Sequence, residues 1–369
     1  MQATGGFQNG FQGVFRTGYI LSARADAVWF LGLPFVAIAF ALAADSWLPF
    51  AALAAINVWV TVPHHYATWV RTYGNRPDFE RFRTRLVAGP LLLLGGVVLG
   101  IAYAPLALFW VIRLWDIQHG FMQQHGFGRI YDFKGGTGAD STRRFDLGLH
   151  AVMYVNMMIA TPLYTQTFWV PGVSSLGIAL TPEQVGLVHT VSWSLTAAYL
   201  VVYTGHLLGS VARGARVNPL KYAFIFASYF LWYFTASQTN SVLVWGIAHR
   251  LMHGLQYIVM VHAYMSRQQQ SPEARMPEAT ARMFRRGGLG FFLGSALLYA
   301  AAYQLLVGGS LSDFGFGFLP GEQPLGTRHE IPLLVQLQIL ALPELFQLAH
   351  FYFDSFVWKV SDKRVQRAL

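Results

Sequence analysis

Histidines are the residues of this chain best suited to chemistry, and the spacing of several is that of metal ligands. The chain has twelve histidines and no cysteine. His249 and His253 are four positions apart, so in a helix both imidazoles project from one face and could bind a single metal ion. The same spacing relates His350 to Asp354. These pairs predict a metal site within helices.

Further histidines lie in segments that would bring them to the same level of a helical bundle. Asp116, His119 and Gln123 share one helix face by their spacing, and adjacent histidines occur at 64 and 65. The candidate metal ligands are His64, His65, His119, His125, His249, His253, His350 and Asp354. Neutral histidine ligands need neighbours that fix their tautomers, and the candidates for this second role are Asp116, Gln123 and Glu344.

The available ligand atoms indicate which metal the site would take. Imidazoles with some carboxylate and no thiolate suit iron, and they suit zinc, copper or manganese less well. The expected cofactor is therefore Fe2+, as one ion or two. The absence of cysteine also excludes disulfides, iron–sulfur clusters and thiol nucleophiles.

Composition places these helices in a membrane. Of the 369 residues, 54% are hydrophobic and 12% are charged, whereas a soluble domain carries about 25% charged residues. A bilayer is crossed by about 20 apolar residues in a helix. Ten stretches meet this requirement: 27–44, 49–70, 86–104, 106–127, 148–168, 184–211, 219–237, 240–265, 287–307 and 331–358.

The basic residues predict how these stretches are oriented. All but three of the 26 Lys and Arg residues fall in the terminal segments or in alternate loops, the exceptions being Arg113, Arg250 and Arg328. Positively charged loops mark the cytoplasmic face, so both termini are expected in the cytoplasm. The even-numbered stretches then run inward, and most of the histidines lie toward the cytoplasmic side.

The sequence thus predicts an all-α, polytopic transmembrane helical bundle of about ten spans in the inner (cytoplasmic) membrane of a bacterium. Residues 1–26 form a cytoplasmic N-terminal tail, residues 27–358 a single transmembrane domain and residues 359–369 a cytoplasmic C-terminal tail. The charge of +9 is explained by the cytoplasmic loops, so no nucleic acid is expected. The expected partners are the lipid bilayer, an apolar small-molecule substrate and O2.

Four histidine segments occur in an order that resembles a known family. They are Val62-Pro63-His64-His65, Gln118-His119-Gly120-Phe121-Met122, Ala248-His249-Arg250-Leu251-Met252-His253 and Ala349-His350-Phe351-Tyr352-Phe353-Asp354. Together they resemble, at a distance, the Brp/Blh family of bacterial membrane β-carotene 15,15′-dioxygenases. The resemblance implies that Fe(II), held by histidines of the first three segments, splits the central double bond of a carotenoid with O2.

The chain also departs from that family's pattern. It is longer, and Pro63-His64-His65-Tyr66-Ala67-Thr68 lacks the Asp that the family carries in its first segment. We therefore expect a membrane-embedded non-haem iron oxygenase acting on a long apolar substrate such as a carotenoid or another isoprenoid. Two alternatives stay open: a di-iron lipid desaturase or hydroxylase, and a non-enzymatic membrane subunit whose histidines ligate haem or chlorophyll. A proton-coupled transporter is a further alternative, but the sequence shows no inverted repeat that would support it.

Overall fold

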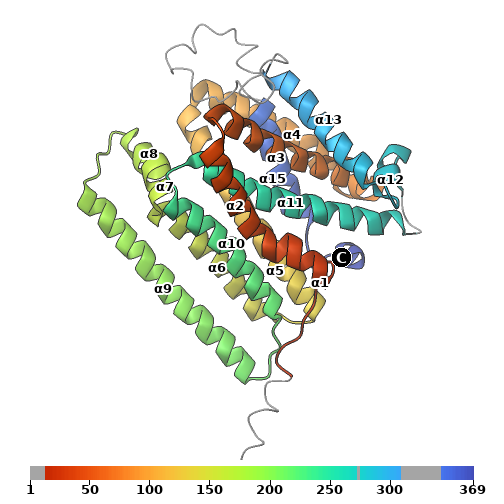
Figure 1. Ribbon diagram of the computed structural model, residues 1–369, viewed down its shortest axis with the longest axis horizontal. Helices are drawn as coiled ribbons and strands as arrows, with labels where there is room; N and C mark the ends of the chain where they lie inside the picture. Colours follow the sequence, from red (N-terminus) through yellow and green to blue (C-terminus); the bar gives the residue numbers. More distant parts are fainter. Residues whose placement is uncertain (1–12, 272–274, 309–341) are drawn as a thin grey trace, which may run out of the picture. The chain divides into compact units, whose positions relative to one another are not determined.

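The computed structural model describes residues 13–271, 275–308 and 342–369, and its regular elements in these ranges are helices (Figure 1). By contacts between Cα atoms the chain divides into two compact units. Unit 1 comprises Met1–Ala41 and Gly120–His249, and unit 2 comprises Leu42–His119 and Arg250–Leu369, counting described residues only. Three helices (α2, α5 and α11) contribute residues to both units.

Unit 1 is built around long helices that follow one another along the chain. Helix α9 packs along α6, and α10 contacts α6, α7 and η1. The elements are α1 (Ala23–Asp26), η1 (Ala27–Gly32), the start of α2 (Leu33–Trp47), the second half of α5 (Pro105–Gly135), α6 (Asp140–Ala160), α7 (Pro162–Tyr164), η2 (Thr165–Trp169), α8 (Val170–Ser174), α9 (Pro182–Ala212), α10 (Pro219–Gln238) and the start of α11 (Val242–Gln269).

Unit 2 places α3 at its centre. Helix α3 contacts α4, α13 and α15, and α15 also packs along α4. The elements are α3 (Phe50–Tyr73), α4 (Arg76–Tyr103), the first half of α5, the larger part of α11, α12 (Glu278–Phe284), α13 (Leu289–Gly308), α15 (Leu342–Val357) and α16 (Lys363–Ala368).

Local sequence explains where several helices begin and bend. Thr181 and Gln184 form a reciprocal capping box that starts α9. Thr161 has an extended backbone (φ −91°, ψ 143°) before Pro162, because the proline ring disfavours the helical conformation of the residue that precedes it. Helix α6 therefore ends there, and the chain continues at an angle of 59°.

The helices coincide with the apolar stretches of the sequence. Nine of the ten predicted stretches overlap a helix throughout most of their length, which confirms the all-helical prediction for them. The tenth is described only from Leu342, so its part before that residue, with Arg328 and His329, lies outside the described residues. Residues 1–12 of the predicted N-terminal tail lie outside them as well.

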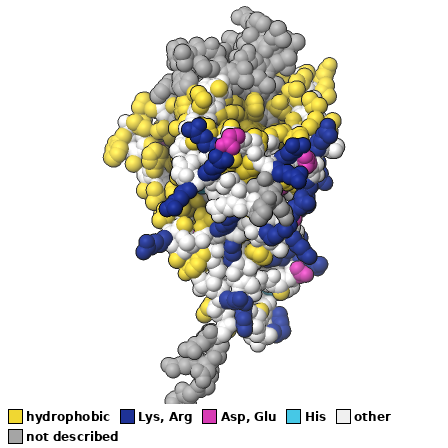
Figure 2. Space-filling model, turned by 90° about the vertical axis from the view of Figure 1, so that its right-hand side faces the viewer, with side chains coloured by type: hydrophobic (Ala, Val, Ile, Leu, Met, Phe, Trp, Pro, Cys, Tyr) yellow, Lys and Arg dark blue, Asp and Glu magenta, His cyan; other side chains and the backbone are white. Residues whose placement is uncertain are grey.

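Fewer helices than predicted have the length and composition of a membrane span by themselves. Among described residues these are the segments Ala23–Trp47, Arg76–Tyr103 and Pro182–Ala212, with a fourth if the bent pair Asp140–Ala160 and Pro162–Ser174 is one span. Two of the histidine-bearing helices, α5 and α11, also carry Arg and Gln, which makes them more polar. Apolar side chains such as Leu195 and Val201 on α9 are exposed, and Figure 2 shows many others on one face of the molecule. Exposed apolar surface of this kind is typical of helices that contact lipid or another protein.

Candidate metal centre

Six of the eight candidate ligands lie in unit 2, on four different helices. Helix α3 carries two, α5 one, α11 one and α15 two. All six are buried or nearly so: His64, His65, His119, His253, His350 and Asp354. Pro63 stands directly before the pair on α3, inside the helix. It supplies no N–H to the helical ladder, which loosens the helix at the point where the two imidazoles leave it.

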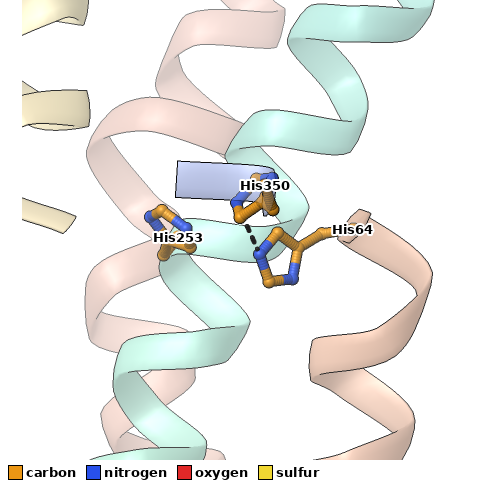
Figure 3. Close-up of side chains that lie close together, drawn as sticks. All are labelled: His64, His253 and His350. Atoms are coloured by element: carbon orange, nitrogen blue, oxygen red, sulfur yellow. Dashed lines mark hydrogen bonds between the residues drawn. The ribbon is translucent and has the colours of Figure 1, made fainter. Parts of the chain in front are cut away.

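His64, His253 and His350 form the first group (Figure 3). Each offers one nitrogen, and the three nitrogens lie within 4.8 Å of one another. The Nε2 atoms of His64 and His350 are 3.1 Å apart. Two nitrogens bound at about 2.1 Å to one ion would be about 3.0 Å apart at a right angle and about 3.4 Å apart at a tetrahedral angle. The observed spacing fits two ligands of one ion, and it also fits an N–H···N hydrogen bond between the two rings.

His119, His350 and Asp354 form a second group that shares His350 with the first. Asp354 Oδ2 lies 3.8 Å from Nε2 of His119 and 3.9 Å from Nε2 of His350. Phe351 stacks on the His119 ring at 4.6 Å and holds its plane. Two histidines and one carboxylate are the ligand set of non-haem Fe(II) oxygenases.

A chain of hydrogen bonds determines which nitrogen of His350 faces these groups. Tyr257 donates its hydroxyl proton to Asp354 Oδ1 at 2.7 Å, and Thr68 donates its proton to the Tyr257 oxygen at 2.9 Å. Thr68 Oγ1, 2.6 Å from His350 Nδ1, has used its only proton and must accept there. His350 is therefore protonated on Nδ1, and its Nε2 lone pair points at His64.

The proton on His350 Nδ1 leaves its Nε2 free to bind a metal ion. The Nε2 lone pair of His350 faces His64 Nε2 in a buried site, and His64 Nδ1 has no hydrogen-bond partner. With the proton of His64 on Nε2, that nitrogen donates to His350 Nε2; with the proton on Nδ1, two lone pairs face one another, and a cation can bind between them. The arrangement fits a cation with nitrogen and oxygen ligands.

His65 lies beside the first group without belonging to either. Its ring centroid is 4.5 Å from that of His64 and 5.0 Å from that of His350. Adjacent residues of a helix point about 100° apart, so His64 and His65 do not present their nitrogens in the same direction.

His249 and His125 belong to unit 1, and neither is part of the two groups. Nδ1 of His249 accepts a hydrogen bond from Trp232 Nε1 at 2.7 Å, and its ring stacks on Trp245 at 4.9 Å. The ring of His125 lies 5.2 Å from that of His150. Of the predicted pair His249 and His253, the groups therefore contain only His253.

The tautomer-fixing role of Asp116, Gln123 and Glu344 stays a prediction. Asp116 Oδ2 lies 3.9 Å from Arg250 Nη2, Glu344 is half-buried six residues before His350, and Gln123 belongs to unit 1. Two further residues, Thr68 and Tyr257, form hydrogen bonds with the candidate ligands. Thr68 follows His64 by four positions, and Tyr257 follows His253 by four, so each shares a helix face with a histidine of the group. This spacing could have identified both residues from the sequence.

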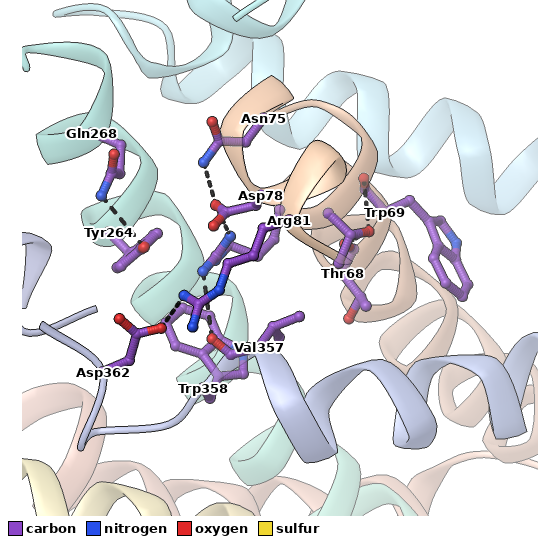
Figure 4. A network of polar contacts seen from close by, with 12 residues as sticks. Thr68, Trp69, Asn75, Asp78, Arg81, Tyr264, Gln268, Val357, Trp358 and Asp362 are labelled. Carbon is purple, nitrogen blue, oxygen red and sulfur yellow. Dashed lines mark hydrogen bonds and ion pairs between the residues drawn. The ribbon is translucent and has the colours of Figure 1, made fainter. Parts of the chain in front are cut away.

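A buried arginine, Arg71, lies near the C-terminal end of α3. Arg71 pairs with Asp78 and lies 4.3 Å from the ring centroid of Tyr264 and 5.1 Å from that of Trp358. Figure 4 shows the polar network around these residues. Since the guanidinium is fully buried, its charge acts on the neighbouring rings with little screening by water.

No family model, no curated protein and no solved structure matches the chain.

Proposed function

We propose that this protein is a membrane-embedded non-haem iron oxygenase that uses O2 on a long apolar substrate, such as a carotenoid or another isoprenoid. The observation that carries the proposal is the group of His119, His350 and Asp354, which matches the two-histidine, one-carboxylate set of such enzymes. Bound Fe(II) would supply the redox chemistry that activates O2. His64 and His253 lie close enough to add two further ligands, and a six-coordinate ion would still have one position for O2.

One ion fits this arrangement better than two. Both groups include His350, whose Nδ1 is bonded to Thr68. Only Nε2 is left to bind a metal, and one lone pair binds one ion. The proposal is therefore a mononuclear centre rather than the di-iron centre of a desaturase or hydroxylase.

The surroundings of the groups favour an apolar substrate. Phe351, which stacks on His119, also packs in an apolar cluster with Val97, Ile112 and Leu348. Apolar side chains beside the candidate ligands would suit an apolar substrate and would keep water away from them.

We further propose that the histidine-bearing helices cross the bilayer with the apolar ones, giving about ten spans with both termini in the cytoplasm of a bacterium. Supporting this, helices α3, α5 and α11 have the length of a span. Their histidines in unit 2 are buried, as polar side chains inside a membrane bundle must be.

The test is the metal content of the protein purified in detergent without chelators. We expect about one iron per chain, lost in His350→Ala. His249→Gln, outside both groups, should keep the iron and serves as the matched control. Two ions per chain would favour the di-iron alternative, and a Soret or pigment absorption band would favour a haem- or chlorophyll-binding subunit. A wild-type protein active without iron would refute the proposal.

A further inference from the structure

Tyr257 is a buried tyrosine whose oxygen is held by three neighbours. Its hydroxyl donates to Asp354 Oδ1 at 2.7 Å, accepts from Thr68 at 2.9 Å and accepts from Trp358 Nε1 at 3.3 Å. The residue is 2% exposed. A phenol whose proton already points at a carboxylate can lose that proton without any movement of heavy atoms.

The Tyr257 ring also packs directly against the candidate ligands. Its centroid is 5.4 Å from the His350 ring and 6.2 Å from the His64 ring. Thr68 is hydrogen-bonded both to the Tyr257 oxygen and to His350 Nδ1, so it links the two residues. Asp354 accepts a hydrogen bond from Tyr257 directly. The phenol is thus in contact with both an imidazole and the carboxylate of the group.

We propose that Tyr257 is a redox-active residue that gives one electron to the metal centre. This role rests on the proposed function, because it requires a metal ion that changes its oxidation state. In the step, the Tyr257 O–H bond breaks and an O–H bond forms on Asp354 Oδ1. The electron goes to an iron ion that O2, the oxidant of the proposed function, has first oxidised above Fe(II); that ion is reduced by one electron, and a neutral tyrosyl radical is left on Tyr257.

The neighbours of Tyr257 stabilise that product. Thr68 and Trp358 donate hydrogen bonds to its oxygen before and after the step, so the radical oxygen stays solvated by the protein. Burial keeps bulk water and external reductants away from it.

The charge of Arg71 keeps the oxidising equivalent on Tyr257. The ring centroid of Trp358 is 6.1 Å from that of Tyr257 and 5.1 Å from that of Tyr264. An electron could therefore pass from Tyr264 through Trp358 to the Tyr257 radical, which would move the radical outward. The guanidinium of Arg71 lies over both of these outer rings. A cation attracts the electron-rich neutral ring and disfavours its oxidation, so Arg71 makes Trp358 and Tyr264 harder to oxidise than they would be without it.

The experiment mixes the iron-loaded full-length protein with hydrogen peroxide and records electron paramagnetic resonance spectra of freeze-quenched samples. We expect a tyrosyl signal in the wild type that narrows when the protein is made with ring-deuterated tyrosine. The signal should be lost in Tyr257→Phe. It should persist in Tyr264→Phe, the matched control seven residues later on α11.

The iron content of each sample separates the two proposals. A tyrosyl signal of equal size in iron-loaded Tyr257→Phe, or no tyrosyl signal in the iron-loaded wild type, would overturn the role of Tyr257 while leaving the iron site standing. A wild-type protein that binds no iron would overturn both.

Discussion

The hydroxyl of Thr68 is the residue-scale detail on which the tautomer of His350 depends. It accepts from His350 Nδ1 and thereby directs Nε2 toward the other ligands. We predict that Thr68→Val weakens metal binding by about 10–100-fold, as loss of a neighbour that orients a ligand does. The stoichiometry at saturating metal should not change. Titration of the metal-free protein with Fe(II) under anaerobic conditions measures the affinity.

A matched control exists in unit 1. Thr235 is also buried, and its hydroxyl donates to a backbone oxygen of its own helix, that of Leu231, at 2.8 Å. Thr235→Val should leave the affinity unchanged. Equal affinities of Thr68→Val and the wild type would show that Thr68 does not orient a ligand.

At the scale of elements, the close approach of α4 and α15 positions two candidate ligands, because α15 carries both His350 and Asp354. Gly89 makes this approach possible: a Cβ atom there would lie 2.3 Å from Tyr352 Cε1. Gly89→Ala should destabilise the protein by about 1–3 kcal/mol, since the tyrosine ring is packed against Phe356 and must shift. Thermal unfolding in detergent measures the change.

Gly96 provides the control on the same helix. A Cβ atom there would meet nothing within 4 Å, so Gly96→Ala should gain up to about 1 kcal/mol of helix propensity. If both variants were equally stable, the tight approach of the two helices would not exist in solution.

Asp362 is the N-cap of helix α16, and its protonation should change the free energy of unfolding of the protein. Burial raises the pKa of Asp362, but hydrogen bonds from the Arg364 backbone and from Arg81, with the charge of Arg81, outweigh it and hold the pKa below 3.8. Its stabilising contribution is therefore present above the unfolded-state pKa and is lost as the pH falls through the lower folded-state pKa.

Asp362→Asn should accordingly lower the free energy of unfolding at neutral pH by less than about 1 kcal/mol, because Arg81 is partly exposed and solvent screens the pair. The difference from the wild type should disappear well below the ordinary pKa of aspartate. Thermal unfolding over a pH series measures it. A difference that grew as the pH fell would contradict the assignment.

At the scale of the whole molecule, the proposed topology can be tested directly because the chain has no cysteine. Helix α9 separates Ile178 from Ala215 and buries little of its apolar surface inside the protein. In right-side-out vesicles, a membrane-impermeant maleimide should label Ile178→Cys and should label Ala215→Cys only after the membrane is opened. Labelling of both sites in closed vesicles would show that α9 does not cross the membrane.

Local sequence was enough to predict which segments are helices and that histidines gather in them. Helix formation and apolarity depend on neighbours within a few residues, so both can be predicted without knowledge of the packing. The spacing of His350 and Asp354 similarly predicted that they would share a helix face. Their closeness to His119, which lies on another helix, could not be predicted in this way.

Packing between helices settled which of these side chains meet. Whether His249 or His253 faces the other ligands depends on how α11 is rotated against its neighbours, and that rotation is set by contacts between residues far apart in the sequence. His253 has its ring 5.1 Å from those of both His64 and His119, whereas His249 bonds to Trp232. Thr68 and Tyr257 acquire their roles in the same way, because a hydrogen bond between helices exists only once the helices are packed.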